Sequence, residues 1–461
     1  MLNFTAANKT YGEASAVNPF PLPKNWKFLG WVMLIACFRM TPHLISKDWV
    51  ADHETAFLQV DSYSYRDAAK DLLQGPAFLN FKHADLNGRT PVYPVFIATV
   101  MRICGPNLFW VVLVQNILLA TLVIPIYHII FWLTRKPWIS VAGTLAWVLD
   151  GATFIYANYV YAEPIYICLS VFSIYFFIVY SEKHHPSYLL GSGILWGLAT
   201  LTRPIGLYAP AIFSLILLAD LNRPIKRRLL SAMIFLIGFG MMILPVLWKR
   251  KQTTGQYLLS NHLVILTREL AYSSLAYRTK IPAKEAQYLF KKDVADHGKD
   301  IDVAAKDEIK RHPGACLELF MKGVALLMLT PGSRDFCTVM GIPSEFSVTT
   351  GAYENPSQSS LSDFIRMVRH AGWAKNIYIA CYGATLFLIY LFIMIDFWNA
   401  RGFPLDDKER MRWLLLLLTA YYVIIIGWIG APRYRAPMMP LLIALACLGV
   451  SRVSRRHQSH C

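Results

Sequence analysis

The sequence contains few charged residues for its length. Only 16% of its 461 residues are Asp, Glu, Lys or Arg, whereas a soluble protein usually has about 25%. The charged residues gather in short clusters between long apolar runs, and 55% of the chain is hydrophobic. Several runs reach the length of about 18 apolar residues that can cross a bilayer. The composition therefore predicts an all-α polytopic membrane protein.

Several motifs of soluble enzymes are missing. There is no G-x-S-x-G, no P-loop and no G-x-G-x-x-G, so neither a serine hydrolase nor a nucleotide site is indicated. The eight cysteines lack CxxC or Cys/His metal spacing. Cys316 and Cys337 are both expected outside the cytoplasm, and whether they pair is left open. The first apolar run starts near Phe28 without a cleavage site, which favours an uncleaved first span.

The net charge of +16 has two explanations. It could form a surface for nucleic acid or another anion. However, most Lys and Arg residues lie beside apolar runs, where they mark the ends of membrane helices. No nucleic-acid-binding motif is present, so we expect no nucleic-acid partner.

We expect about ten transmembrane helices. A break is expected at Arg203-Pro204, because proline disfavours helix in the residue before it. The apolar stretches 91–104 and 315–330 are not counted, and we interpret them as interfacial helices. Whether they span is left open, since one further span would move every later loop to the other side. The expected spans are 27–45, 108–134, 138–159, 163–181, 188–204, 205–222, 229–248, 373–398, 413–430 and 437–452.

The basic loops set the expected orientation. Placing them in the cytoplasm satisfies the positive-inside rule and puts both termini inside. The loops 46–107 and 249–372 then face outward, and Lys249 to Lys251 are an exception to the rule. We expect one transmembrane domain, 1–452, and a basic cytoplasmic tail, 453–461. A bacterial inner membrane is the default location, because no eukaryotic retention signal is present.

The first external loop contains two candidate site residues. Asp61 opens an amphipathic helix expected over 61–73, where a carboxylate near the membrane can act as a general base. The alternative is that Asp61 caps this helix. Arg89 lies where a guanidinium could bind a lipid-linked phosphate. The alternative for Arg89 is an interfacial anchor, with Tyr93 in the aromatic belt.

Further polar residues stand at span ends. Glu163 heads a span, where it could complement the helix dipole or hold a sugar hydroxyl. Asp150 lies within an apolar run, and intramembrane acids are functional candidates. Arg203, Arg433 and Arg435 are expected on the same external side as Arg89, which suits an anionic headgroup such as phosphate. Interfacial anchoring is the alternative for these arginines.

Five segments together resemble the GT-C superfamily of membrane glycosyltransferases, and most closely the branch of protein O-mannosyltransferases and the aminoarabinose transferase of lipid A. They are DSYSYRDAAKDLLQG (61–75), GRTPVYPVFIA (88–98), YAEPIYI (161–167), GLATLTRPIGL (197–207) and RYRAPMMPLL (433–442). The resemblance implies a GT-C-like bundle with interfacial helices in the first external loop. It also implies a polyprenyl-phosphate sugar donor used at the outer face.

The resemblance assigns roles to individual residues. Asp61 matches the catalytic acid of the first external loop, Arg89 a basic residue that contacts the donor phosphate, and Tyr65 a tyrosine of the same pocket. Family members often have a second acid after the first, and Ser62 stands there instead. We therefore expect no cofactor or metal, although a divalent metal is left open. The C-terminal soluble domain of the lipid A enzyme is not expected.

The predicted reaction is transfer of one sugar from a polyprenyl-phosphate donor to a lipid, glycan or protein acceptor. Asp61 would deprotonate the acceptor, and Arg89 with Arg433 or Arg435 would stabilise the departing phosphate. A single displacement would invert the anomeric centre. A flippase or transporter of lipid-linked sugars and a surface-glycan polymerase or ligase are the alternatives. The sequence does not reveal the sugar or the acceptor.

Overall fold

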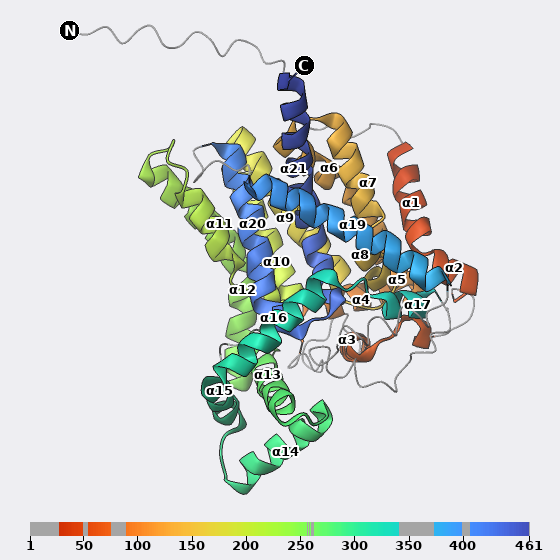
Figure 1. Ribbon diagram of the computed structural model, residues 1–461, viewed down its shortest axis with the longest axis vertical. Helices are drawn as coiled ribbons and strands as arrows, with labels where there is room; N and C mark the ends of the chain where they lie inside the picture. The colour runs from red at the N-terminus through yellow and green to blue at the C-terminus, as the bar shows by residue number, and fades with distance from the viewer. Residues whose placement is uncertain are drawn as a thin grey trace, which may run out of the picture.

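The computed structural model describes residues 27–48, 54–74, 89–255, 257, 259, 262–340, 373–398 and 406–460. Every regular element within these ranges is an α-helix or a 3-10 helix, which confirms the predicted all-α class. Long helices form a bundle, and a smaller group of helices, α13 to α15, projects from the end away from the C-terminus (Figure 1).

Six described helices are long and apolar enough to cross a membrane, and two bent pairs raise the number to eight. The chain is thus a multi-pass membrane protein. The bent pairs are α7 (Pro137–Val148) with α8 (Gly151–Ala157), at 42°, and α15 (Ile301–Arg311) with α16 (Pro313–Leu329), at 89°. The six are α5–α6 (Leu108–Thr121 and Val123–Thr134), α9 (Glu163–Lys183), α12 (Ile225–Thr254), α19 (Trp373–Trp398), α20 (Asp407–Ile426) and α21 (Met439–His460).

The other expected spans correspond to shorter helices. The span expected at 27–45 is split into α1 (Lys27–Arg39) and α2 (Thr41–Ser46). The break expected at Arg203-Pro204 is confirmed: α10 (Pro186–Thr202) ends there, and Arg203 is extended with φ −141° and ψ 123°. The 3-10 helix η2 (Pro204–Gly206) and α11 (Ala209–Leu218) follow.

The two apolar stretches not counted as spans also form helices. Residues 91–104 give α4 (Val92–Cys104), which has 13 residues and is shorter than a span. Residues 315–330 fall in α16 (Pro313–Leu329), which buries Leu319 and Leu327 and exposes Leu317. Cys316 on α16 and Cys337 are both free thiols, so the structure contains no disulfide between them.

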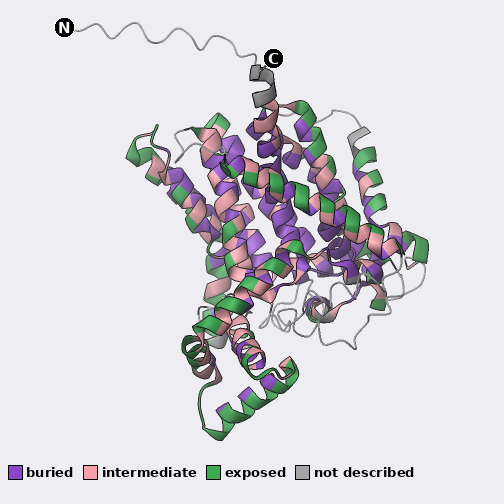
Figure 2. Cartoon of the chain, in the orientation of Figure 1, coloured by how far each residue is buried: buried purple, intermediate pink, exposed green. Residues whose placement is uncertain are grey.

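The bundle core is apolar and closely packed. Buried residues concentrate in its centre, whereas α13 to α15 are largely exposed (Figure 2). A Cβ added at Gly193 of α10 would lie 2.1 Å from the carbonyl oxygen of Phe235 on α12. Glycine therefore permits the close approach of these two helices, as small residues do in membrane bundles.

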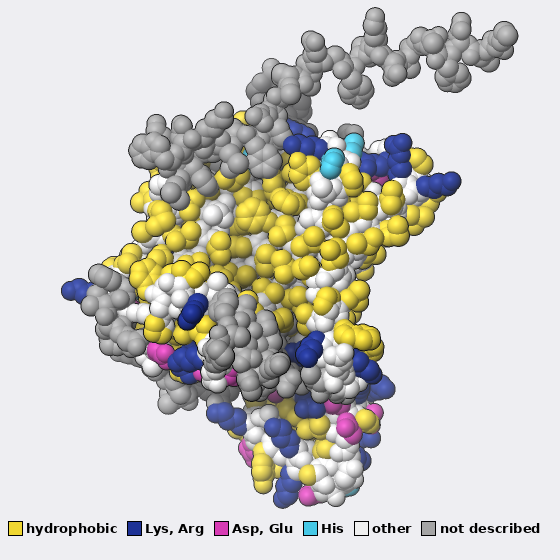
Figure 3. All heavy atoms as spheres, turned by 180° about the vertical axis from the view of Figure 1, so that it is seen from behind, with side chains coloured by type: hydrophobic (Ala, Val, Ile, Leu, Met, Phe, Trp, Pro, Cys, Tyr) yellow, Lys and Arg dark blue, Asp and Glu magenta, His cyan; other side chains and the backbone are white. Residues whose placement is uncertain are grey.

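A hydrophobic band separates two charged ends of the molecule (Figure 3). At the end that contains the C-terminal part of α21, Asp396 is almost fully buried and pairs with Arg412 at 2.5 Å and with Arg452 at 2.6 Å. Lys136, between α6 and α7, donates to Ser454 Oγ at 2.7 Å. These contacts place the basic segments around Lys136 and Arg452 together.

The opposite end contains the shorter helices of the predicted external loops. The sequence also predicts that the helix beginning at Asp61 ends at Gly75 and Pro76 and that 343–362 forms a loop, and both features lie outside the described residues. The elements present are η1 (Glu54–Phe57), α3 (Val60–Leu72), α8 (Gly151–Ala157), α13 (His262–Thr279), α14 (Ala283–Asp296), α15 (Ile301–Arg311), α17 (Ser333–Val339), η4 (Gly427–Ile429) and η5 (Pro432–Met438).

Candidate active site

The helix α3 carries Asp61 in its first turn, close to the predicted position. Its buried residues Tyr65, Ala68, Ala69 and Leu72 recur at helical spacing, as the amphipathic pattern predicted. The alternative role of Asp61 as the N-cap is wrong. The cap position is Gln59, whose backbone N–H donates to Ser62 Oγ at 3.0 Å. The carboxylate of Asp61 is therefore available for other partners.

Two arginines from distant parts of the chain hold the Asp61 carboxylate. Nη2 of Arg89 donates to Oδ1 at 3.0 Å, and Nη1 of Arg433 donates to Oδ2 at 2.6 Å. Burial alone would raise the pKa of Asp61, but the adjacent charges of Arg433 and Arg89 hold it well below its usual range. The Asp61 side chain stays 33% exposed, so the carboxylate is ionised and reachable.

A second carboxylate, that of Glu163, also contacts Arg433. Glu163, in the first turn of α9, has a side chain that is only 1% exposed, and it bonds Arg433 and Arg203, the latter at 2.5 Å. Removing one member of such a buried pair leaves an uncompensated charge. Glu163 therefore fixes the two guanidinium groups.

Aromatic rings cover the guanidinium groups. Arg89 lies 4.6 Å from the ring centre of Tyr65, Arg433 lies 3.6 Å from that of Tyr161, and Arg203 lies 5.1 Å from that of Tyr434. Such contacts strengthen when water is excluded. They hold the planes of the guanidinium groups in place. Burial also raises the pKa of Tyr65, which stays protonated.

Tyr93 supports the site from the interior. Its ring meets that of Tyr65 edge-on at 5.0 Å, and its hydroxyl donates to Gln115 at 3.1 Å. The residue is 0% exposed, so the alternative that placed Tyr93 in the aromatic belt is wrong. Gln115 in turn donates to the carbonyls of Ala157 and Tyr159, both at 2.7 Å, which ties α5 to the segment before Glu163.

Two predicted site residues lie elsewhere. Arg435 is 0% exposed and donates to the carbonyls of Leu327 and Thr330 at the end of α16. Asp150 caps α8 by accepting from the backbone N–H of Thr153 at 2.7 Å, and it also accepts from the Tyr382 hydroxyl at 2.8 Å. Both residues stabilise helix ends, and neither contacts the Asp61 cluster.

Three residues that sequence reasoning did not select adjoin the cluster. Arg250 at the end of α12 donates to the carbonyl of Arg89 at 2.9 Å. Arg250 belongs to the segment that departs from the positive-inside rule, and this departure is the sequence feature that could have indicated its role. Tyr161 lies under Arg433, and Asp335 on α17 accepts from the Tyr156 hydroxyl at 2.6 Å. Nothing in the sequence pattern marked Asp335.

The charge balance of the cluster favours an anion over a metal cation. Three arginines, Arg89, Arg203 and Arg433, surround the two carboxylates of Asp61 and Glu163. Within the described ranges, no group of three or more His, Cys, Asp or Glu side chains could hold a metal ion. Guanidinium groups bind phosphate oxygens, like carboxylate oxygens, through paired charge-assisted hydrogen bonds.

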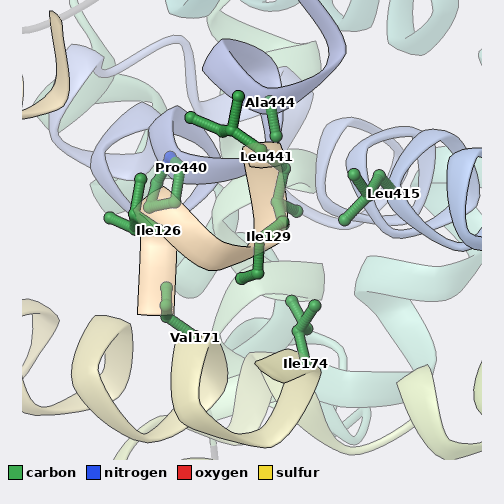
Figure 4. A pocket seen from close by; sticks show the side chains of 9 residues that line it. Ile126, Ile129, Val171, Ile174, Leu415, Pro440, Leu441 and Ala444 are labelled. Atoms are coloured by element: carbon green, nitrogen blue, oxygen red, sulfur yellow. The ribbon is translucent and has the colours of Figure 1, made fainter. Parts of the chain in front are cut away.

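An apolar pocket inside the bundle is separate from this cluster. Side chains from α6, α9, α20 and α21 line it (Figure 4), and they carry no polar group that could take part in chemistry. Its lining residues are Ile126, Ile129, Ile130, Val171, Ile174, Leu415, Pro440, Leu441 and Ala444. The pocket belongs to the core between the spans and not to the site.

Comparison with known proteins supports the resemblance seen in the motifs. Residues 88–248 match the model of the dolichyl-phosphate-mannose-protein mannosyltransferase family. That segment contains Arg89, Glu163 and Arg203, three members of the ion-pair cluster. A comparison with curated protein sequences found no match.

Solved structures with the same fold are those of an archaeal oligosaccharyltransferase. The Archaeoglobus fulgidus enzyme AglB, in complex with an inhibitory peptide and a dolichol-phosphate, aligns over 94% of this chain and 51% of its own, with 13% identity and a TM-score of 0.51. Its apo form gives 14% identity and a TM-score of 0.52 over the same shares. The chain thus spans about half the length of these proteins.

A further solved structure is that of ArnT from Cupriavidus metallidurans, bound to undecaprenyl phosphate. It aligns over 92% of this chain and 78% of its own, with 13% identity and a TM-score of 0.40. The family segment, the fold shared with AglB and the motifs around Asp61 and Arg433 agree with one another. Residues 88–248 thus resemble that mannosyltransferase family, and the chain as a whole shares the fold of AglB.

Proposed function

We propose that this protein transfers one sugar from a polyprenyl-phosphate donor to an acceptor on the extracytoplasmic side of the membrane. The observation that carries the proposal is the position of Asp61 between Arg89 and Arg433, at 3.0 and 2.6 Å. A base and two phosphate-binding groups thus meet at one point. The dolichol-phosphate in the AglB structure supports a lipid-phosphate donor for the shared fold.

The donor phosphate would bind to Arg89 and Arg433. Each guanidinium can form paired hydrogen bonds with phosphate oxygens. When the bond between the anomeric carbon and the phosphate oxygen breaks, the carrier phosphate gains one negative charge. The two arginines stabilise this charge where it develops. Glu163 would keep Arg433 oriented, because its buried carboxylate holds the other side of that guanidinium.

Asp61 would act as the general base. A carboxylate held by two arginines is a weak base, since both charges lower its pKa. A bound phosphate competes for Arg89 and Arg433, so the pKa of Asp61 rises as the donor enters. Asp61 would then accept the proton of the acceptor hydroxyl while the hydroxyl oxygen bonds to the anomeric carbon. One displacement of this kind inverts the anomeric centre.

The proposed orientation places the site outside the cytoplasm. The basic segments around Lys136 and Arg452 lie together at the end of the bundle opposite the Asp61 cluster, which suits a cytoplasmic location under the positive-inside rule. We therefore propose cytoplasmic termini, a single domain over residues 1–452 with a basic tail at 453–461, and a bacterial inner membrane as the location.

A transfer assay with the purified protein in nanodiscs tests the proposal. Sugar transfer from a polyprenyl-phosphate donor should be seen with the wild type. It should fall about 100- to 10,000-fold in Asp61→Asn, the range that a general base contributes. Asp71→Asn is the matched control, because Asp71 is on the same helix and its side chain contacts Gln74. Movement of the donor across the bilayer without chemical change would support a transporter instead.

A further inference from the structure

A series of contacts connects Arg89, in the proposed phosphate site, to the carboxylate of Asp335. Arg89 bonds Asp61, and Asp61 bonds Arg433. The guanidinium of Arg433 in turn lies 3.6 Å from the ring centre of Tyr161.

Beyond Tyr161 the series of contacts ends at Asp335. The rings of Tyr161 and Tyr156 have their centres 6.4 Å apart, and the Tyr156 hydroxyl donates to Oδ2 of Asp335 at 2.6 Å. A Cβ built on Gly332, at the start of α17, would lie 3.5 Å from Pro432, the residue before Arg433. The helix that carries Asp335 is thus packed against the segment that carries Arg433.

Tyr161 provides an independent indication of a ligand. The residue is only 7% exposed, and its contacts in the described part of the chain are with rings and with the guanidinium of Arg433. Its hydroxyl makes no hydrogen bond there, and it is not among the side-chain atoms sealed from solvent. Burial of the ring raises the pKa of this tyrosine, so the hydroxyl remains a donor.

We propose that Tyr161 and Asp335 form the acceptor subsite, and that it takes a neutral sugar with free hydroxyl groups. This inference rests on the proposed function. The acceptor hydroxyl must reach Asp61, the proposed base. The Tyr161 ring lies on Arg433, which bonds Asp61, and Tyr156 connects Tyr161 to Asp335.

The chemistry of the subsite selects the class of ligand. A carboxylate accepts hydrogen bonds at two oxygens, so Asp335 can hold neighbouring hydroxyls of a sugar ring in addition to Tyr156. The Tyr161 hydroxyl can donate to a further sugar oxygen. The negative charge of Asp335 disfavours a phosphorylated or carboxylated acceptor, because like charges repel.

Ligand binding to the full chain in nanodiscs tests the subsite. Methyl α-mannopyranoside and a panel of other neutral methyl glycosides are the acceptor probes, detected by saturation-transfer NMR, and farnesyl phosphate is the probe for the phosphate site. We expect Asp335→Asn and Tyr161→Phe to weaken binding of the glycoside at least about tenfold, the loss of one or two hydrogen bonds. Affinity for farnesyl phosphate should stay within about twofold in both variants.

The variants are chosen to preserve the fold. Asparagine at 335 can still accept from Tyr156, and phenylalanine at 161 keeps the ring that covers Arg433. Asp293→Asn is the matched control, because Asp293 lies on α14 with a side chain that is 70% exposed. Glycoside binding by Asp293→Asn should equal that of the wild type.

The outcomes separate the two proposals. Wild-type glycoside binding by Asp335→Asn and Tyr161→Phe would overturn the subsite, as would a wild type that binds none of the neutral glycosides. An equal loss of farnesyl phosphate would also overturn it, since these residues would then serve the donor or the fold. If Arg89→Ala keeps its affinity for farnesyl phosphate, the proposed function itself is wrong.

Discussion

Arg433 and Asp61 are 372 positions apart in the sequence, yet Nη1 of Arg433 lies 2.6 Å from Oδ2 of Asp61. The pair joins the first turn of α3 to the 3-10 helix η5 that precedes α21. Both residues occur in motifs that resemble the GT-C superfamily, at opposite ends of the chain. In the proposed function this contact joins the phosphate site to the general base, and the following predictions depend on it.

Arg89→Ala should weaken binding of the donor. A hydrogen bond to a charged group contributes about 1.5–3 kcal/mol, which corresponds to about 10- to 100-fold in affinity. Arg89→Lys should recover part of this, because lysine keeps the charge but loses the paired geometry. Farnesyl phosphate affinity in nanodiscs is the measurement. Arg66→Ala is the control, since Arg66 pairs with Glu54 and Asp67. Equal losses of affinity in Arg89→Ala and Arg66→Ala would contradict the assignment of Arg89 to the phosphate site.

Glu163→Gln should destabilise the protein and reduce transfer together. The substitution leaves the guanidinium groups of Arg203 and Arg433 without their buried counter-charge, a change that typically costs about 3–5 kcal/mol. Thermal unfolding in detergent should therefore shift to lower temperature. Adding Arg203→Gln removes one of the unpaired charges and should recover part of the stability but not the transfer rate. A stable and fully active Glu163→Gln would show that this carboxylate does not position Arg433.

The pH dependence should differ between the free and the donor-bound enzyme. The folded pKa of Asp61 lies below its ordinary value of 3.8, so the stability from its ion pairs is present above about pH 4 and is lost only as the pH falls through the folded pKa. When the donor phosphate binds Arg89 and Arg433, the pKa of Asp61 should rise, because the phosphate competes for the charges that lower it.

Steady-state kinetics can detect this shift. The profile of kcat/KM reports the free enzyme, and that of kcat reports the bound complex. The acidic limb of kcat should therefore lie at higher pH than that of kcat/KM for the donor. Coincident limbs would mean that the phosphate does not compete with Asp61 for the arginines.

Arg435→Ala should lower stability without affecting the phosphate site. Its guanidinium donates to three carbonyls at the end of α16, those of Leu327, Met328 and Thr330, and these would lose their partner. The unfolding temperature should fall, while the folded protein binds farnesyl phosphate within about twofold of the wild type. A loss of affinity as large as that of Arg89→Ala would show that Arg435 belongs to the donor site.

Much of the site could be predicted from the sequence, because membrane topology restricts which polar residues can lie on the same side of the bilayer. The order of apolar runs and basic loops put Asp61, Arg89, Glu163, Arg203 and Arg433 at the same membrane face, and the structure brings these five into contact. The rule that proline disfavours helix before it correctly located the bend at Arg203. Physical rules that act locally were sufficient for these features.

Other features depend on geometry that the sequence does not display. Arg433 and Arg435 were both candidates for the donor phosphate, but they lie in the 3-10 helix η5, where three residues make a turn. Residues two apart therefore point in different directions, and only Arg433 reaches Asp61. Asp150 appeared to lie inside a continuous span, whereas α7 ends at Val148 and the carboxylate caps α8. Asp335 follows a long external segment without any motif, so only the folded chain places it near Tyr161.

The bond between Asp61 and Arg433 also has a consequence for biosynthesis. The first partner is translated early, and the second precedes the last helix, α21. Until that final helix has left the ribosome and inserted, the early carboxylate has Arg89 as its partner but lacks Arg433, and Glu163 lacks one of its two arginines. The ion-pair cluster thus cannot be complete in a nascent chain, and under the proposed function a protein truncated before residue 433 should be inactive even with most of its spans inserted.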